Sequence, residues 1–342
     1  MSELSVTKIT DRVGTGKVNF SQGFKVAGTL DTTLAPTRTE GNTEPATPVN
    51  GDTWYDTDND TYDVYINDEW KRFLGAGGGA VSWTADVSSF SYDSVSFSVV
   101  SQSTSCGTIR FNTDGTKAYT CDINSGTIYQ YSLTTGFDIS TASYDSVSFD
   151  ASTQEANTTS FFFNTDGTKM YVIGFGDVVY QYSLSTAFNV GTATYDSVSF
   201  TSNETLPRSL FFSVDGTKMY VLGQGNDTVY EYTLSTGFDL STASYNSVSL
   251  NVSSQETLPS GVFFNPDGTK MYICGQTSDS IHQYTLSTGF DLSTASYDNS
   301  SFNINTSGSS NYSTGLAFNA DGTKAYITDS SLDSFLQYST GL

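Results

Sequence analysis

The chain alternates between short runs of apolar or aromatic residues and short stretches of Gly, Asp, Asn, Ser and Thr. From residue 81 onward the runs follow one another in an order that repeats. One copy holds four runs, at residues 209–212, 219–222, 228–234 and 245–250. Runs of this length that are rich in Val, Phe and Tyr and bounded by turn residues are typical of β-strands. Each copy therefore predicts four short strands.

A tight turn marks every copy. The sequence Asp-Gly-Thr-Lys occurs five times, with its aspartates at Asp114, Asp166, Asp215, Asp267 and Asp321. Asp and Gly suit a hairpin turn with a positive φ, and Lys protects an exposed strand edge. The aspartates are 49 to 54 residues apart, and a unit of about 50 residues with four strands is typical of a propeller blade. We therefore expect an all-β fold, a five-bladed β-propeller that spans residues 81–342.

The ends of the repeat region predict that the ring is closed. Residues 92–97 match the fourth strand of each copy, but no blade precedes them. The last copy ends with a third strand at residues 335–338 and lacks a fourth. We expect the N-terminal strand to complete the last blade, which removes open sheet edges.

Composition argues against two kinds of partner. The chain has 14 Lys and Arg against 36 Asp and Glu, a formal net charge of −22. Nucleic acid is not expected, because phosphate backbones require clustered Lys and Arg. No stretch of 18 apolar residues occurs, so membrane insertion is not expected either.

The start lacks the apolar segment of a secretory signal, which predicts synthesis in a host cytoplasm and release by lysis.

The first 33 residues predict an extended arm. Their apolar runs, at residues 17–20 and 24–27, could pair as a hairpin but are too short to bury a core. Such an arm would dock by adding strands to another subunit. The docking residues would be Val18, Phe20, Phe24 and Val26. A frayed terminus is the alternative.

Three further segments precede the repeats. Residues 34–51 are rich in Pro and Thr and predict a linker, and residues 75–80 are a Gly-rich joint. Between them, residues 52–74 predict three alternating strands in a small β-meander. Its aromatic residues, such as Trp54 and Trp70, are expected to pack against one another, with sugar binding as the alternative.

The meander carries a resemblance. Residues 48–59, Pro-Val-Asn-Gly-Asp-Thr-Trp-Tyr-Asp-Thr-Asp-Asn, and the later Trp-Lys-Arg-Phe at 70–73 resemble a small module of bacteriophage virion proteins. Tail fibres and related appendages carry it near their attachment ends. The resemblance implies a location on the virion, contacts with other virion proteins, and a homo-oligomer such as a trimer. The repeats likewise resemble those of bacterial and phage propellers, which implies fold and not activity.

Charges are sorted between the two faces of the expected ring. The loops that enter each blade and the loops between its second and third strands share one face, and the Asp-Gly turns lie on the other. Seven carboxylates are expected on a rim of the first face, Glu155, Glu204, Glu256, Asp177, Asp227, Asp279 and Asp333. They could bind a receptor or Ca²⁺ or Mg²⁺, or they could simply keep the protein soluble. Arg208 and the loop tips Leu206-Pro207 and Leu258-Pro259 are further candidates.

Catalytic residues are scarce. The single histidine, His282, occupies a position that holds Tyr in three other copies, so we expect it to pack in a sheet without a nucleophile beside it. Only Arg110 and Arg208 are available in the repeats to bind a substrate carboxylate, too few for a sialidase-like site. Glycosidase chemistry by a carboxylate pair stays open. The sequence therefore favours a protein that is not an enzyme and needs no cofactor.

Together these features predict a tail fibre or spike protein that displays a propeller for host-surface receptor binding, possibly to a glycan. The main alternative is a capsid decoration or head-fibre protein. A polysaccharide-degrading tailspike is the second alternative.

Overall fold

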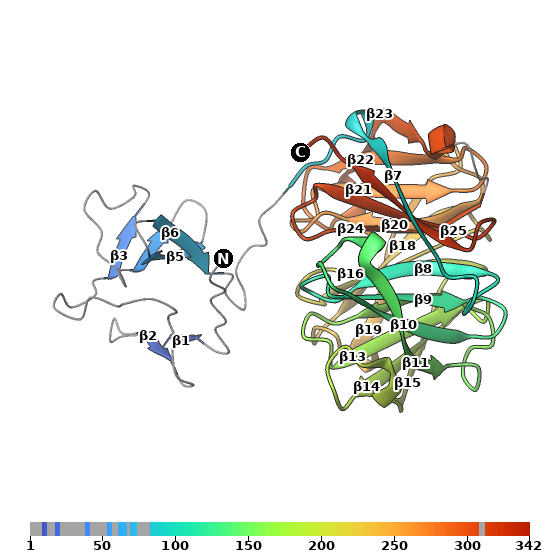
Figure 1. Cartoon of the computed structure of the whole chain (residues 1–342), viewed down its shortest axis with the longest axis horizontal. Helices are drawn as coiled ribbons and strands as arrows, with labels where there is room; N and C mark the ends of the chain where they lie inside the picture. Colours follow the sequence, from blue (N-terminus) through green and yellow to red (C-terminus); the bar gives the residue numbers. More distant parts are fainter. Residues whose placement is uncertain are drawn as a thin grey trace. The chain divides into compact units, whose positions relative to one another are not determined.

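The computed structural model of the chain describes residues 83–307 and 312–342 and, before them, only six strands. The chain divides into two compact units, Met1–Val81 and Ser82–Leu342 (Figure 1). The second unit is a five-bladed β-propeller of four-stranded antiparallel sheets. Within the described residues, no helix combines the length and the apolar character needed to cross a membrane.

The first unit contains two small sheets. β1 (Ile9–Asp11) and β2 (Val18–Phe20) form an antiparallel pair. The other sheet has the order β3 (Arg38–Gly41), β4 (Thr53–Asp56), β5 (Thr61–Ile66) and β6 (Glu69–Phe73). β4, β5 and β6 are antiparallel neighbours, as the predicted meander requires.

Two details of this unit go beyond the predictions. β3 lies inside the predicted linker and pairs in parallel with β4, so part of this segment joins the sheet. A strand without apolar content can still join a sheet edge, because backbone hydrogen bonds make the pairing. In the arm, Val18 and Phe20 lie on β2, whose partner is β1, a segment absent from the predicted hairpin. Phe24 and Val26 lie outside the described residues.

Each propeller blade has four strands. Blade 1 contains β8 (Cys106–Phe111), β9 (Lys117–Asp122), β10 (Thr127–Leu133) and β11 (Ala142–Asp150). Blade 2 contains β12 (Thr158–Phe163), β13 (Lys169–Gly174), β14 (Val178–Leu184) and β15 (Ala193–Thr201). Blade 3 contains β16 (Pro207–Phe212), β17 (Lys218–Gly223), β18 (Thr228–Leu234) and β19 (Ala243–Asn251). Blade 4 contains β20 (Pro259–Phe264), β21 (Lys270–Gly275), β22 (Ser280–Leu286) and β23 (Ala295–Asn303). Blade 5 contains β24 (Ser313–Phe318), β25 (Lys324–Asp329), β26 (Ser334–Ser339) and β7 (Ser91–Ser98).

A short 3₁₀ helix precedes the fourth strand of every blade. These helices are η1 (Val87–Ser89), η2 (Ile139–Thr141), η3 (Val190–Thr192), η4 (Leu240–Thr242) and η5 (Leu292–Thr294), and η6 (Ile304–Ser307) follows β23. An Asp or Asn caps each of η1 to η5 by accepting a backbone N–H, as Asp239 does from Ser241. The first helical residue of each is buried, so the helix anchors the outer strand.

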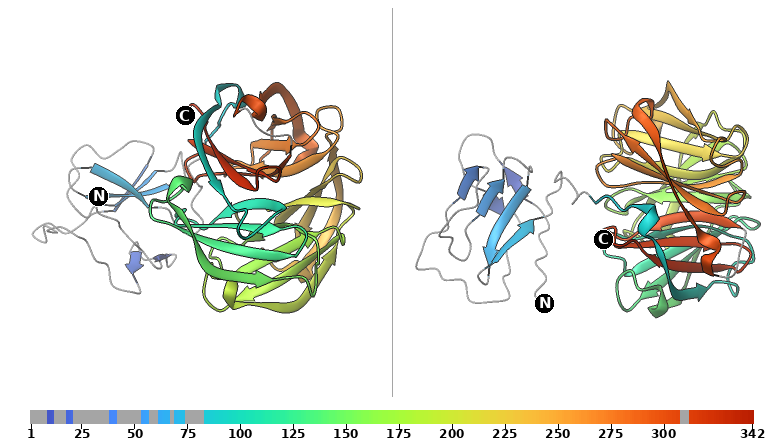
Figure 2. Two further views of the ribbon diagram at one scale, coloured as in Figure 1. Left: turned by 45° about the vertical axis from the view of Figure 1, so that its right-hand side comes forward. Right: turned by 90° about the horizontal axis from the view of Figure 1, so that it is seen from above.

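The predicted closure of the ring is confirmed. β7 pairs antiparallel with β26, with Tyr92 opposite Tyr338, so the first strand of the second unit completes the C-terminal blade (Figures 1 and 2). A tyrosine of the second strand in every blade also donates its hydroxyl to a backbone carbonyl of the next blade. The donor and acceptor residues are Tyr119 and Phe188, Tyr171 and Phe238, Tyr220 and Phe290, Tyr272 and Ala85, and Tyr326 and Phe137. The last of these bonds joins blade 5 to blade 1.

The turn lysines form ion pairs and do not stand free at a strand edge. Four of them bind an aspartate of the fourth strand at 2.7–2.9 Å, in the pairs Lys117–Asp145, Lys169–Asp196, Lys270–Asp298 and Lys324–Asp93. In these blades a glutamine of the third strand, such as Gln181, donates to the same carboxylate. In blades 1, 2 and 4 its Oε1 accepts from the 3₁₀ helix of the next blade, as from Leu240 N.

Blade 3 exchanges the two polar groups. Its carboxylate is Glu231 on the third strand, its amide is Asn246 on the fourth, and Lys218 pairs with Glu231. Glu231 Oε2 accepts from Leu292 N at 2.9 Å. Every blade therefore keeps one carboxylate and one amide beside its lysine, because one negative charge balances the buried end of the lysine.

The Asp-Gly turns have the predicted geometry. Their glycines have φ near +70°, as in Gly216, where a side chain would be strained. Asp215 Oδ1 accepts the backbone N–H of Thr217 at 3.0 Å. A Cβ on Gly216 would also lie 2.3 Å from the ring of Phe238, so the turn packs directly on the loop before the fourth strand.

Candidate functional site

The loops that enter each blade meet the loops between its second and third strands. Glu155, in the loop before β12, accepts the N–H of Gly176, in the loop after β13. We call the face that carries both sets of loops the loop face, and the opposite face, with the Asp-Gly-Thr-Lys turns, the turn face. The predicted sorting of loops between the two faces is therefore confirmed.

The three glutamates of the predicted rim are buried. Glu155, Glu204 and Glu256 are 5%, 0% and 1% exposed. Glu204 Oε1 accepts the backbone N–H groups of Thr205 and Leu206 in its own loop and of Gly225 in the neighbouring loop. The expectation that these three residues offer their carboxylates on the surface is wrong, because backbone N–H groups inside the loops bind the carboxylates instead.

Glu256 uses both of its oxygens. Oε1 accepts from Leu258 N and Thr277 N, and Oε2 accepts from the N–H and hydroxyl of Ser278. Burial raises the pKa of Glu256, but these hydrogen bonds outweigh burial and hold the pKa below its ordinary value. The carboxylate is therefore ionised and committed to holding two loops together.

A pattern among the repeats signals this role. Blades with a loop glutamate have a glycine at the end of the second strand, and a Cβ on Gly223 would lie 2.5 Å from Glu204 Cγ. In blade 1 the glutamate is replaced by Ser103 and the glycine by Asp122, which accepts from Ser103 Oγ and Thr104 N. The carboxylate thus comes from one loop or the other. Sequence comparison of the blades could have revealed this exchange.

The four aspartates of the rim have a conformational role. Asp177, Asp227, Asp279 and Asp333 have φ between 45° and 62°, at the position of Gly126 in blade 1. Asp is one of the few residues that tolerate this left-handed region. Burial raises the pKa of Asp177 and Asp333, and burial with the charge of Glu256 raises that of Asp227. Within the described residues, no group of three or more acidic, histidine or cysteine side chains is arranged to hold a metal ion.

Exposed apolar side chains gather on the loop face instead. Leu206, Leu258 and Tyr312 are 43%, 42% and 52% exposed, and each is the last residue before the first strand of its blade. We call these three residues the apolar arc, since blades 3, 4 and 5 are consecutive in the ring. Val100 and Leu332, on other loops of the same face, are also exposed. The two predicted loop tips, Leu206-Pro207 and Leu258-Pro259, belong to this surface.

Inside the arc lies the mouth of the central channel. It is lined by Ile123, Thr159, Arg208, Ser260, Gln276 and Thr314, which come from all five blades. Thr159 Oγ1 donates to Pro207 O at 3.0 Å and Thr314 Oγ1 to Cys106 O at 2.8 Å. Because these hydroxyls bind the backbone of the next blade, they close the floor of the mouth. A ligand would lie across the loop face and not enter the channel.

Arg208 is held at this mouth. Its guanidinium carbon lies 4.6 Å from the centre of the Phe175 ring, and its Nε donates to Gln224 Oε1 at 3.0 Å. Burial lowers its pKa, but arginine remains charged at neutral pH. No carboxylate of the described residues pairs with Arg208, whereas every turn lysine is paired.

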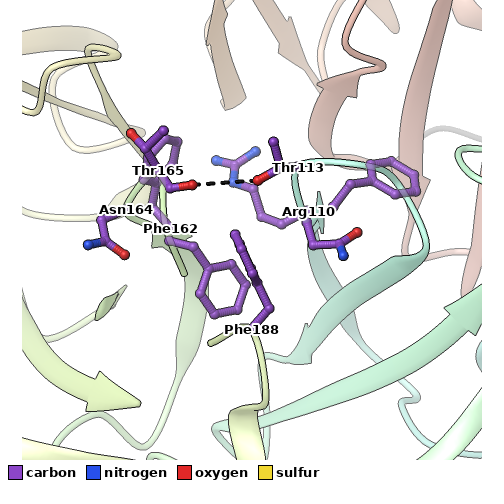
Figure 3. A pocket seen from close by; sticks show the side chains of 9 residues that line it. Arg110, Thr113, Phe162, Asn164, Thr165 and Phe188 are labelled. Atoms are coloured by element: carbon purple, nitrogen blue, oxygen red, sulfur yellow. Dashed lines mark hydrogen bonds between the residues drawn. The ribbon is translucent and has the colours of Figure 1, made fainter. Parts of the chain in front are cut away.

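The other arginine serves the ring itself. Arg110 is 6% exposed and donates to backbone carbonyls of four blades: Phe161, Ile109, Leu316 and Leu210. Burial lowers its pKa to about 10. Below it, near the turn face, a cavity of about 190 Å³ is lined by Arg110 together with Phe162, Phe188 and other residues (Figure 3). Since its hydrogen bonds go to the blades, Arg110 clamps the inner strands.

The prediction that His282 has no nucleophile beside it is wrong. Ser278 Oγ lies 2.9 Å from His282 Nε2, and Tyr297 Oη lies 3.4 Å from Nδ1. Ser278 Oγ also bonds to Glu256 Oε2 at 2.6 Å, and the N–H groups of Thr277 and Ser278 already bind Glu256. The nearby amides are thus not free to stabilise an oxyanion, as hydrolysis by a serine requires. This cluster orders a loop.

Comparisons with known proteins identify no family. No protein-family model and no curated protein sequence matches the chain. Among solved structures it is similar to a chain of the mitotic checkpoint complex, at 9% identity and a TM-score of 0.42, over 82% of this chain and 71% of that one. It is also similar to a candidate 6-phosphogluconolactonase from Bacteroides uniformis, at 15% identity and a TM-score of 0.42, over 68% and 67% of the two chains. A third similarity is to the Cps50 (Swd1) β-propeller domain of Myceliophteria thermophila, at 9% identity and a TM-score of 0.40, over 69% and 96%. Likenesses as distant as these carry no conclusion about function.

Proposed function

We propose that the chain is a virion appendage protein, and that its propeller binds a host-surface receptor through the loop face and catalyses no reaction. The observation that carries the proposal is where exposed apolar side chains lie. Of the seven large hydrophobic residues exposed in the described part of the chain, five lie on loops of one face. Gathered apolar residues on the surface of a highly charged protein mark an interaction site.

The attachment to a virion rests on the first unit. Residues 48–59 and 70–73 resemble the module that phage appendages carry near their attachment ends, and they lie in and beside the meander of β4, β5 and β6. An arm with β1 and β2 supplies strands that could pair with a neighbouring virion protein. Several copies on one particle would bind a repetitive cell surface with an avidity well above that of a single propeller.

Binding without catalysis fits the chemistry of the loop face. Its glutamates are buried and bound to backbone N–H groups, so they cannot act as the paired acid and base that glycosidases use. The nucleophile–histidine pair at Ser278 and His282 lacks free oxyanion donors. What the face offers is apolar contact and one unpaired cation.

Adsorption to bacterial envelopes tests the proposal. Labelled full-length protein would be added to envelopes from a panel of bacterial species, and bound protein would be measured. We expect Leu206→Ser with Leu258→Ser to reduce adsorption at least about tenfold, since each buried leucine contributes roughly 1.5–3 kcal/mol. Val214→Ser is the matched control, because Val214 is 47% exposed on a turn of the opposite face.

Two results would overturn the proposal. One is a wild-type protein that adsorbs to no envelope of the panel, and the other is a loop-face variant that adsorbs as well as the Val214→Ser control. Release of sugar from the envelopes would favour the tailspike alternative. Antibody labelling of particles from lysed cultures, viewed by electron microscopy, separates the remaining alternatives, because label on the tail is expected and label on the head would indicate a decoration or head-fibre protein.

A further inference from the structure

We infer that Arg208 and Gln224, flanked by the apolar arc, bind a carboxylate group on an acidic sugar of the receptor. This inference rests on the proposed function, because it names the class of ligand for the same face. The observation behind it is that the channel mouth has hydrogen-bond donors that lack acceptors.

Arg208 is oriented before any ligand arrives. Stacking on Phe175, at 4.6 Å, fixes the plane of the guanidinium, and the bond from Nε to Gln224 fixes its rotation. Within the described residues the Arg208 side chain makes this one hydrogen bond, so both Nη groups are left for a ligand or water. A positioned guanidinium loses little entropy on binding, which favours affinity.

Gln224 adds a second donor. Its Oε1 accepts from Arg208, while its Nε2 is buried and has no hydrogen-bond partner. Buried donors are nearly always paired, and one that is not marks either strain or a missing acceptor. Here the unpaired amide lies beside an unpaired cation. The Gln224 amide and the Arg208 guanidinium together would bind an acceptor that has more than one oxygen and a negative charge.

A carboxylate meets that requirement best. Its two oxygens match the planar fork of a guanidinium in a bidentate pair. A phosphate would bring more negative charge to a face that carries Asp227 and Glu204 on the adjoining loops and a single uncompensated cation. Repulsion by those carboxylates therefore disfavours the more highly charged ligand.

The surroundings indicate a sugar rather than a small free acid. The mouth has a closed floor, so a ligand lies flat across several blades. Leu206 and Leu258 offer apolar contact to the C–H faces of a sugar ring, and Gln276 at the mouth offers an amide for its hydroxyls.

Calorimetry with the full chain tests the inference. The probes would be sialyllactose and trigalacturonic acid, each compared with its methyl ester, which keeps the sugar and removes the charge. We expect at least one free acid to bind at least about tenfold more tightly than its ester. Arg208→Gln is expected to abolish this difference. Lys117→Gln, which removes one positive charge from the other side of the propeller, is the control and is expected to keep it.

Two further variants sharpen the result. Arg208→Lys keeps the charge but loses the planar fork, and we expect binding weaker than wild type by about tenfold. Gln224→Leu removes only the unpaired donor and one bond to Arg208, and we expect a loss of about threefold to tenfold without unfolding. Circular dichroism and a melting curve for each variant would show that the fold is kept.

The inference is overturned if folded wild-type protein binds none of the acids, if acid and ester bind equally, or if Arg208→Gln binds the acid as wild type does. The adsorption assay distinguishes this failure from failure of the proposed function. Wild type and Arg208→Gln that adsorb equally to envelopes would leave receptor binding in place and remove the acidic sugar. A wild type that does not adsorb would remove both.

Discussion

The turn face and the loop face come from the same five repeats but are built by different rules. On the turn face every blade repeats one solution, with an Asp-Gly-Thr-Lys turn, a paired lysine and a packed loop. On the loop face the blades differ: three use a buried glutamate, blade 1 uses Asp122, and only blade 3 has an arginine at the channel mouth. The regular face maintains the ring, and the variable face is the one that we propose binds the receptor.

The largest expected effect separates two glutamates that look alike in sequence. Glu256→Gln is expected to destabilise the protein by about 2–3 kcal/mol, because both oxygens accept N–H or O–H groups and an amide nitrogen would face donors. Glu204→Gln is expected to cost less than about 1 kcal/mol, since all three of its bonds go to Oε1 and Oε2 has no partner. Urea unfolding measures both.

Equal losses from these two substitutions would show that burial alone, and not the number of bonded oxygens, decides their contribution. Glu204→Ala is a useful reference, because it removes the acceptor entirely. It is expected to be clearly less stable than Glu204→Gln.

A smaller effect is expected from reversing the exchange of carboxylate and amide in blade 3. Glu231→Gln alone leaves Lys218 without a carboxylate, and Asn246→Asp alone places two carboxylates together, so each is expected to cost about 1–2 kcal/mol. The double variant reproduces the arrangement of the other blades and is expected to lie within about 0.5 kcal/mol of wild type. A double-mutant cycle in urea measures the coupling, and simple additivity would contradict the exchange.

The smallest effect is a contrast in pH dependence between the faces. On the loop face, burial raises the pKa of Asp227, so the folded state favours its protonated form, and stability is lost as pH rises through that pKa. Near the turn face, burial raises the pKa of Asp298 but bonds from Lys270, Thr285 and Gln283 outweigh it. Its pKa is therefore lowered, and its contribution is present above about pH 4 and is lost as pH falls through the folded value.

Replacing Asp227 or Asp298 by asparagine tests the direction of each predicted effect on stability. Asp227→Asn keeps a residue that tolerates φ of 49° and is expected to raise stability slightly at pH 7 but not at pH 3, while Asp298→Asn is expected to lower it at pH 7. Melting temperatures at the two pH values measure the difference. The same sign at both positions would contradict the contrast.

Much of the fold could be read from local patterns. The number of blades, the closing strand β7 and the two faces follow from the spacing of repeats, because each strand and turn is set by residues close to it in sequence. Asp215-Gly216 illustrates this, since the positive φ of Gly216 and the bond from Thr217 N to Asp215 Oδ1 both lie within the turn.

The candidate site depended on contacts between distant segments. Glu204 is buried because Gly225, 21 residues later, presents an N–H to it, and no local pattern shows which carboxylate meets such a donor. Ser278 and His282 are only four residues apart, but the sequence does not show that the loop before β22 turns the hydroxyl toward the ring. Glycine opposite each loop glutamate was the one signal in the sequence that could have revealed the burial.

By itself, then, the sequence determined the repeating scaffold of the protein, since hydrophobic alternation and turn chemistry act over a few residues. The tertiary structure alone decided which charges face solvent, because burial and hydrogen bonding depend on how loops from different blades meet. In this structure the three glutamates expected on the surface are buried and join neighbouring loops. Arg208 is left as the unpaired cation at the channel mouth.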